Sequence, residues 1–337
     1  MACYVSICIP SYNRPMELKR LLESVDYSGD KELEIVICED KAPLGEEVER
    51  IVYNYQENSK YKVRFSHNEV NCGYDKNLRQ CIDHAHGKWI IFMGDDDLFI
   101  PGKLNLFIDF LAEHEMAGYV LRSYQANHID GSTEVFKYYS EDKMFEAGVE
   151  TYIDLFNKST FISSFTFQRE LALPFRTDKL DGSLLYQLYI LAEICLRYPS
   201  AYCAIPFTQS IEGGTPYFGS SESEKGKYTP GTISLDNSVE FIKQHYLVID
   251  YIDQINDIHA ADIIRHNMSK YSYPLLSIQR ERGIKEFNRY NKMLRSIGLD
   301  KSIYYNIYYI GLLVFGKNVC DRIIRTLKQM IGHRPRL

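Results

Sequence analysis

The sequence lacks the features that define several protein classes. Its N-terminus, MACYVSICIPSYNRP, has no basic region followed by a long apolar stretch, so we expect no signal peptide. No run reaches the roughly 18–20 apolar residues that span a bilayer, which argues against an integral membrane protein. The net charge of −6 over 337 residues gives no electrostatic reason to expect a nucleic-acid partner. The eight cysteines form no CxxC pair and show no zinc-ligand spacing, which favours a reducing, cytoplasmic compartment.

The common phosphate-binding motifs are also missing. There is no GxGxxG after the first apolar run and no GxxxxGK[ST] anywhere in the chain. If phosphates bind here, the backbone N–H groups of a Gly-rich loop are not their main binding groups. A divalent cation held by carboxylates could neutralise and bridge diphosphate oxygens instead.

The first 115 residues alternate between apolar runs and amphipathic segments. Buried strands are predicted at 4–9, 33–38, 62–67 and 89–93, and helices are predicted at 16–25, 46–56, 75–84 and after Pro101. This alternation predicts βαβ units and a mostly parallel sheet flanked by helices, the α/β fold class.

Beyond residue 115 the pattern changes. A hairpin is predicted around Asp130-Gly131, a strand within 161–169, and a helix opened by Asp181. Residues 210–234 are dense in Gly, Ser and Pro and predict a mobile loop that could serve as a lid. We therefore expect a catalytic domain at 1–235, with a nucleotide-binding half at 1–115 and an acceptor-binding half at 116–235, followed by a helical region at 236–337.

Polar residues follow each of the first four predicted strands. Because ligands bind at the carboxyl ends of parallel strands, these residues are expected to gather at one edge of the sheet. The fourth strand runs directly into Asp95, Asp96 and Asp97. A solvated loop or a helix N-cap is the ordinary alternative for such a run. The polar residues at the other three strand ends favour a metal site.

The ordered set VSICIPSYNRPMELKRLLESV, LEIVICEDKA and NCGYDKNLRQCIDHAHGKWIIFMGDDDLFIPGKL resembles the family 2 glycosyltransferases of the GT-A fold. Within that family it is similar to the abequosyltransferase-like group that builds bacterial surface polysaccharides. The resemblance covers about residues 4–110 well and 160–200 loosely. It implies a glycosyltransferase of the hexosyltransferase type, a nucleoside-diphosphate sugar donor, and Mn²⁺ or Mg²⁺ as cofactor.

The resemblance also assigns roles to particular positions. It implies that Asp40 contacts the base, that Asp95 meets the ribose, that Asp96 binds the metal, and that Asp97 reaches the metal through water or contacts a sugar hydroxyl. Glu39 and Lys41-Ala42 depart from the usual residues beside Asp40, so the nucleobase stays open. The remaining donor-binding positions that it implies are Pro10, Tyr12, Arg14, Gly73 and Arg79.

The family places its catalytic carboxylate at the start of a later helix, which points to Asp181 and, as a second candidate, Asp178. A helix N-terminus favours an ionised Asp, as a general base requires, although an Asp there is more commonly a simple N-cap. Deprotonation of an acceptor hydroxyl by this carboxylate implies an inverting reaction.

The tail combines apolar and basic segments. Residues 302–316 hold no charge, and 301–337 contain seven Lys or Arg against one Asp, a balance of +6 that leaves −12 for the rest of the chain. Such a segment can lie in a membrane interface or pack on protein, and a lipid-linked glycan acceptor favours peripheral contact with the inner face of the plasma membrane. Whether the protein is a homo-oligomer stays open.

The sequence leaves two alternatives to a glycosyltransferase. A nucleotidyltransferase shares the sheet architecture, but it needs a basic, Gly-rich loop after the first strand, and SYNRP is neither. A catalytically inactive binding subunit of the same fold is the other rival, and the intact carboxylate run argues against it.

Overall fold

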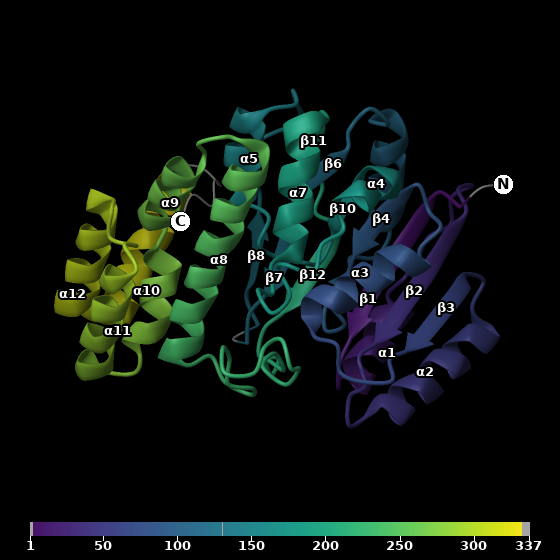
Figure 1. Ribbon diagram of the computed structural model, residues 1–337, viewed down its shortest axis with the longest axis horizontal. Helices are drawn as coiled ribbons and strands as arrows, with labels where there is room; N and C mark the ends of the chain where they lie inside the picture. The colour runs from purple at the N-terminus through teal and green to yellow at the C-terminus, as the bar shows by residue number, and fades with distance from the viewer. Residues whose placement is uncertain (1–2, 130, 332–337) are drawn as a thin grey trace. The chain divides into compact units, whose positions relative to one another are not determined.

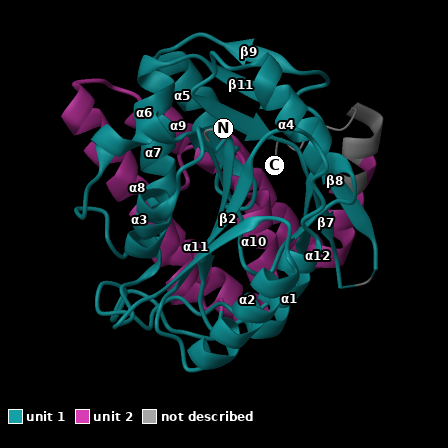
Figure 2. Ribbon diagram, turned by 90° about the vertical axis from the view of Figure 1, so that its right-hand side faces the viewer, with its two compact units in different colours: residues 1–232 teal, residues 233–337 magenta. Residues whose placement is uncertain are grey.

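The structure is a computed structural model that describes residues 3–129 and 131–331. The chain divides into two compact units, residues 1–232 and residues 233–337 (Figure 2). The first unit holds every strand described and the second holds only helices.

The main sheet of the first unit has eight strands in the order β3-β2-β1-β4-β10-β6-β11-β9. The strands β1, β2, β3 and β4 are parallel to one another, whereas β10 runs antiparallel to both β4 and β6. The sheet is therefore mixed, with the predicted βαβ units at its N-terminal half (Figure 1). Its strands are β1 (Val5–Ser11), β2 (Leu33–Glu39), β3 (Lys62–His67), β4 (Trp89–Phe92), β6 (Tyr119–Arg122), β9 (Lys143–Phe145), β10 (Phe165–Gln168) and β11 (Ser200–Cys203).

The inner strands form the core because their residues are apolar on both faces. All four residues of β4 are buried, as are all seven of β2, which matches a sheet covered on both sides. The amphipathic α1 buries Leu18, Leu21 and Leu22 against this core. The helices of the first unit are α1 (Pro15–Glu23), α2 (Gly45–Asn58), α3 (Tyr74–His84), α4 (Lys103–Glu113), α5 (Val149–Phe156), α6 (Arg169–Ala172) and α7 (Tyr186–Arg197), with a 3₁₀ turn at Leu173–Phe175.

A second sheet of four strands has the order β5-β12-β7-β8. The predicted hairpin is present, because β7 pairs antiparallel with β8 on either side of Gly131. Residue 130, the other half of the predicted turn, lies outside the described residues. The strands are β5 (Leu98–Phe99), β7 (Tyr124–Asn127), β8 (Thr133–Phe136) and β12 (Thr208–Ile211).

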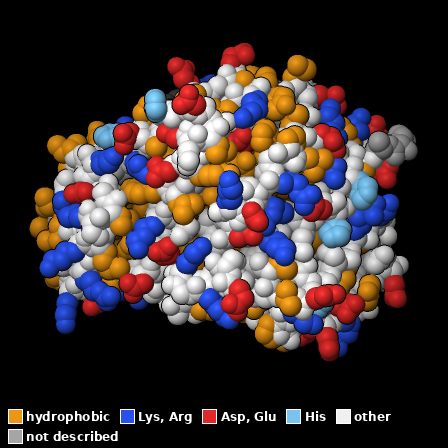
Figure 3. Space-filling model, in the orientation of Figure 1, with side chains coloured by type: hydrophobic (Ala, Val, Ile, Leu, Met, Phe, Trp, Pro, Cys, Tyr) orange, Lys and Arg blue, Asp and Glu red, His pale blue; other side chains and the backbone are white. Residues whose placement is uncertain are grey.

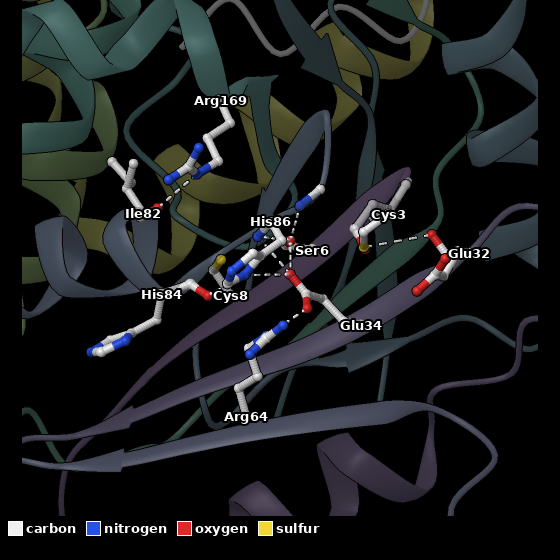
Figure 4. A network of polar contacts seen from close by, with 12 residues as sticks. Cys3, Ser6, Cys8, Glu32, Glu34, Arg64, Ile82, His84, His86 and Arg169 are labelled. Atoms are coloured by element: carbon white, nitrogen blue, oxygen red, sulfur yellow. Dashed lines mark hydrogen bonds and ion pairs between the residues drawn. The ribbon is translucent and has the colours of Figure 1, made fainter. Parts of the chain in front are cut away.

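The start of β2 contains a buried carboxylate that is fully engaged by its neighbours. Glu34 accepts hydrogen bonds from the Ser6 hydroxyl at 2.7 Å, from the backbone N–H of His86 at 2.6 Å and from Arg64 Nε at 2.8 Å (Figure 4). Ser6 in turn accepts from the N–H of Gly87 at 2.8 Å. A buried charge needs such partners, and these fix the turn that leads into β4.

The second unit is a cluster of helices with its own core, which includes the buried side chains of Leu276, Phe287, Tyr290 and Leu312. The final helix bends at Gly316, whose backbone leaves the helical region with φ 75°. The helices are α8 (Leu235–Asn256), α9 (Ala261–Lys270), α10 (Tyr273–Arg280), α11 (Ile284–Ser296) and α12 (Ile303–Ile331). Within the described part of the chain, no helix has both the length and the apolar character needed to cross a bilayer.

Candidate active site

The parallel pairing of β1, β2 and β4 brings the carboxyl ends of these strands to one edge of the sheet. Two of the predicted polar segments meet there directly. The backbone N–H of Tyr12, just after β1, donates to Asp95 Oδ2 at 3.0 Å. Pro10 lies inside β1, one residue before its end, in register with Cys38 of β2. The loop after β1 and the acidic run after β4 therefore form one site.

Arg14 lies between the first two carboxylates of the acidic run. Its Nη1 atom is 2.9 Å from Asp95 Oδ1 and 2.9 Å from Asp96 Oδ2. Asp95 is nearly inaccessible, whereas the side chain of Asp96 keeps 25% of its surface exposed. Burial raises the pKa of Asp95 to about 6, the Arg14 charge opposes this rise, and the neighbouring Asp96 adds to it. The Arg14 guanidinium thus forms ion pairs with both carboxylates.

Asp97 is directed away from the Arg14 contact. Its Oδ2 accepts a hydrogen bond from the Ser163 hydroxyl, and its Oδ1 lies 3.4 Å from the N–H of Ile211 in β12. Ser163 also accepts from the N–H of Gly94 at 2.9 Å. Asp97 therefore anchors the acidic run to the loop before β10. Burial, followed by the charge of Asp96, raises its pKa to about 7.

The raised pKa of Asp97 predicts how stability depends on pH. Its ordinary pKa is near 3.8, so between this value and about 7 the folded protein binds the proton more tightly than the unfolded chain. Stability without metal should therefore fall as pH rises through this window. We expect Asp97→Asn to raise the melting temperature at about pH 8, by about 2–4 °C per kcal/mol gained, and to flatten the pH dependence. Thermal unfolding from about pH 5 to 8 measures both.

The control is Asp109→Asn, which changes an exposed carboxylate on α4. This variant should keep the wild-type pH dependence. An Asp97→Asn protein with the same slope as wild type, or with lower stability at the alkaline end, would contradict the assignment.

Asp40, the predicted base contact, is buried and holds the segment before α3. It accepts hydrogen bonds from Asn68 Nδ2 at 2.8 Å and from the N–H groups of Cys72 and Gly73 at 2.7 and 2.9 Å. Burial raises its pKa, and these three donors oppose the rise. The neighbouring Glu39 is buried as well and accepts from the N–H of Ala42 at 2.7 Å. The carboxylates at the end of β2 thus shape the loops that adjoin the site.

Gly73 is the residue before α3 and has φ 87°, a conformation that favours glycine. A Cβ atom there would come within 2.6 Å of Ser221 Oγ and 2.8 Å of Ser223 Oγ. Glu224 accepts from the N–H of Tyr74, the first residue of α3, at 2.9 Å. The 210–234 segment therefore packs closely on the start of α3, and Gly73 makes this approach feasible.

Arg79 and Asp181 form a two-pronged ion pair. Arg79 Nη1 and Nη2 lie 2.5 and 2.8 Å from the two oxygens of Asp181. The Arg79 side chain is 10% exposed and that of Asp181 is 24% exposed. The predicted donor-site arginine and the predicted base thus meet, and the base keeps one edge open to solvent.

The expectation that Asp181 opens a helix is wrong. The helix α7 begins at Tyr186, and Gly182 and Leu184 have positive φ values of 81° and 65°, which place a turn between Asp181 and the helix. Asp75 accepts from the N–H of Tyr186, the first residue of α7, at 3.0 Å and from the N–H of Leu184, just before the helix, at 2.9 Å. The N-terminus of α7 therefore does not lie at Asp181, and Arg79 provides the positive charge beside this carboxylate.

Asp178, the second candidate base, is exposed, and its backbone carbonyl accepts from the N–H of Asp181. Sequence analysis missed the roles of three buried residues, Asp75, Ser163 and Glu224. Their hydrogen bonds hold the segments that carry the site residues. Their sequence context holds no motif, because each pairs with a residue more than 60 positions away.

The order and direction of the strands place the protein in a known fold class. TarS of S. aureus, solved with UDP-GlcNAc, has a TM-score of 0.56 at 14% identity, over 95% of this chain and 92% of that one. A mannosyltransferase from Pyrobaculum calidifontis, solved with GDP-Man and Mn²⁺, has a TM-score of 0.54 at 13% identity, over 100% and 86% of the two chains. The predicted GT-A fold is confirmed.

The sequence comparisons then define the family. Residues 6–169 match the family described as glycosyl transferase family 2, so this part of the chain is a family 2 glycosyltransferase domain and the protein is a glycosyltransferase, as predicted. An uncharacterized glycosyltransferase of Haemophilus influenzae is 22% identical over 84% of this chain and 92% of its own length. The abequosyltransferase of Salmonella typhimurium is 28% identical, but the match covers only 32% of each protein.

The residues present can accommodate a divalent cation. The guanidinium of Arg14 already stands between Asp95 and Asp96, so positive charge fits at this point. Among the described residues no three His, Cys, Asp or Glu side chains converge as a complete metal cage. Magnesium-type sites with one or two carboxylates commonly take their other oxygens from substrate phosphates, which suits a diphosphate donor.

Proposed function

We propose that the protein transfers a sugar from a nucleoside-diphosphate sugar to a hydroxyl group of a glycan, with a divalent cation and with inversion at the anomeric carbon. The observation that carries this proposal is the acidic pair Asp95–Asp96, which shares one cationic group at the carboxyl edge of the sheet. The GT-A fold supports a nucleotide-sugar donor, and the solved relatives were captured with UDP-GlcNAc and with GDP-Man and Mn²⁺.

The proposed cofactor is Mn²⁺ or Mg²⁺, held by Asp96 as the more accessible carboxylate of the pair. When bound, it neutralises the charge that develops on the leaving diphosphate. Asp95 would meet the ribose and Asp97 would hold Asp96 in place through the Ser163 contact. The remaining residues that we assign to the donor pocket at the same edge are Pro10, inside β1, together with Tyr12, Arg14, Asp40 and Gly73.

Asp181 is the proposed general base. Its carboxylate takes the proton of the acceptor hydroxyl as that oxygen bonds to the anomeric carbon, and the bond from this carbon to the diphosphate breaks. Arg79 fixes the plane of the carboxylate with two hydrogen bonds. Attack opposite the leaving group inverts the anomeric configuration.

We further propose a lipid-linked glycan acceptor in bacterial surface polysaccharide synthesis. The support is the resemblance to the Salmonella abequosyltransferase and to a Campylobacter jejuni glucosyltransferase whose name specifies an undecaprenol-linked glycan. The C. jejuni match is 26% identical over 32% of that protein's length. Transfer assays with nucleotide sugars and polyprenyl-diphosphate glycans test the reaction, and the anomeric coupling in the product's NMR spectrum tests inversion. A retained configuration would overturn the proposed mechanism.

The final helix offers a surface for contact with a lipid membrane. Ile303, Ile307, Ile310 and Val314 follow one another at helical spacing and are 71%, 55%, 57% and 66% exposed. The opposite face of α12 buries Leu312 and its neighbours in the second unit's core. Hydrophobic side chains gather over α12 at the left edge of Figure 3. An exposed apolar stripe of this kind indicates an interaction surface.

The charge that follows the stripe favours an anionic membrane as the partner. Lys317 and Arg322 follow the stripe in the sequence, with Lys317 Nζ 2.6 Å from Glu281 Oε1, and further basic residues come at 325 and 328. Residues 332–337, part of the tail predicted to contact the membrane, lie outside the described residues. Basic residues near an anionic surface contribute about 1 kcal/mol each, and a helix with this stripe can lie in the interface.

We therefore expect the double variant Ile307→Lys/Ile310→Lys to lose binding to vesicles of phosphatidylcholine and phosphatidylglycerol. Sedimentation with these vesicles, and with vesicles of phosphatidylcholine alone, measures the loss. Ile263→Lys, which changes an equally exposed isoleucine on α9, is the control and should bind like wild type. Light scattering reports self-association. The assignment would be overturned if wild type did not sediment with the vesicles. It would also be overturned if the double variant bound vesicles like wild type and differed only in dissociating a dimer.

A further inference from the structure

Arg14 connects the acidic run to the long segment between β12 and α8. Its Nη1 atom contacts Asp95 and Asp96, while its Nη2 atom donates to the backbone carbonyl of Thr215 at 2.6 Å. The guanidinium also lies 5.4 Å from the ring centre of Tyr217, at cation–π distance. A Cβ atom on Gly214 would lie 3.0 Å from Asp96 Oδ2, so the segment passes directly beside the carboxylate. One side chain therefore holds both the acidic run and residues 213–217.

The same segment is fastened at two further points of the site. Glu224 accepts from the N–H of Tyr74 at the start of α3 and from the N–H of Gly219 within the segment at 2.7 Å. Lys227 Nζ lies 3.4 Å from the backbone carbonyl of Asp181. Residues 213–227 thus extend from Asp96, past the start of α3, to the proposed base Asp181. We call this stretch the strap.

We propose that Arg14 is an internal counter-ion, which takes the place of the divalent cation in the free enzyme and ties the strap across the site. This inference rests on the proposed function, because it assigns the Asp95–Asp96 pair to a cation and a diphosphate. Arg14 must leave these carboxylates before Asp96 can bind a divalent cation. Its departure also removes the hydrogen bond to Thr215, so opening of the strap and loading of the site are coupled.

The charges support this exchange. Two adjacent carboxylates with little exposure repel each other unless a positive group lies between them, and Arg14 supplies that group. Once displaced, the guanidinium remains close enough to pair with phosphate oxygens, which arginine binds with two parallel hydrogen bonds. The carboxylates therefore keep a positive partner while the donor enters.

A purely structural arginine and an internal counter-ion predict opposite effects on metal binding. If Arg14 only maintains the shape of the site, its removal should weaken Mn²⁺ binding. If Arg14 competes with the cation, its removal should strengthen Mn²⁺ binding because the carboxylates lose their competing partner. Both roles predict a looser strap, so metal affinity is the measurement that separates them.

The experiment compares wild type with Arg14→Gln in calorimetric titrations of Mn²⁺ alone, without nucleotide, and in hydrogen exchange of peptides covering 213–227. We expect Arg14→Gln to bind Mn²⁺ about tenfold more tightly, which corresponds to about 1.4 kcal/mol, and to exchange faster in the strap. Tyr217→Leu keeps the guanidinium but removes one contact of the strap, so it should loosen the strap and tighten Mn²⁺ binding less than Arg14→Gln does. Arg50→Gln, an exposed arginine on α2, is the matched control and should change neither.

The outcomes separate this inference from the proposed function. If Asp96→Asn abolishes Mn²⁺ binding but Arg14→Gln binds no more tightly than wild type, the counter-ion role is overturned and the metal site stands. If Mn²⁺ alone binds neither wild type nor Arg14→Gln, the counter-ion role is overturned, and titration of a nucleoside diphosphate together with Mn²⁺ decides whether the metal dependence stands. Tighter binding by Arg14→Gln, together with faster exchange of the strap, supports the coupling.

Discussion

Replacement of Asp96 by Asn should lower kcat/KM for sugar transfer by about 10²–10³-fold, the effect of removing one electrostatic stabiliser of the transition state. Asn has the same shape but carries no charge, so it holds the proposed cation much more weakly and cannot balance the charge of Arg14. Steady-state transfer rates at saturating Mn²⁺ measure the loss. The donor affinity should fall as well, because the diphosphate would bind without its counter-charge.

Two comparisons make this result specific. Asp109→Asn, exposed on α4, should transfer sugar at the wild-type rate. Asp97→Asn should lose less than Asp96→Asn, because Asp97 is turned toward Ser163 and Ile211 rather than toward Arg14. If folded Asp96→Asn kept near-normal activity, the acidic run would have no essential role in sugar transfer.

Asp181→Asn should reduce kcat by about 10²–10⁴-fold, the contribution that general base catalysis typically makes. Donor binding should change little, because Asp181 faces the acceptor side in the proposed reaction. The amide oxygen introduced by this substitution could still accept one hydrogen bond from Arg79, so the variant should keep its fold. Single-turnover rates together with calorimetric donor affinity separate the two effects.

Asp178→Asn is the matched variant, since it changes a carboxylate only three residues away that is exposed to solvent. We expect it to retain its activity. If Asp178→Asn loses the activity and Asp181→Asn keeps it, Asp178 is the base and the Arg79–Asp181 ion pair is structural.

Much of the site could be predicted because it depends on local order. Each of the first strands is a short apolar run, and the residue after a parallel strand must lie at the carboxyl edge of the sheet. The sequence alone therefore predicts that Tyr12 and Asp95 lie near each other, and the structure joins them by a hydrogen bond. The alternation of strands and helices up to residue 115 follows from the same local periodicity.

The parts that could not be predicted depend on contacts between distant segments. Asp181 looks like a helix N-cap because it precedes an apolar run, yet Asp75 from α3 supplies the acceptor for α7. The contact of Arg14 with Thr215 joins residues 201 positions apart, and no periodicity reports such a pairing. The antiparallel insertion of β10 between β4 and β6 is another case, since the short run FTFQ carries no signal of its direction.

The decisive experiment for the proposed donor site is calorimetric titration of UDP, CDP, GDP and dTDP, with and without Mn²⁺, on wild type and on Asp96→Asn. We expect a nucleoside diphosphate to bind wild type only when Mn²⁺ is present, and Asp96→Asn to remove this binding. The base that binds then identifies the donor pool. If none of the four binds wild type under either condition, the acidic run is no diphosphate site and the proposed function is contradicted.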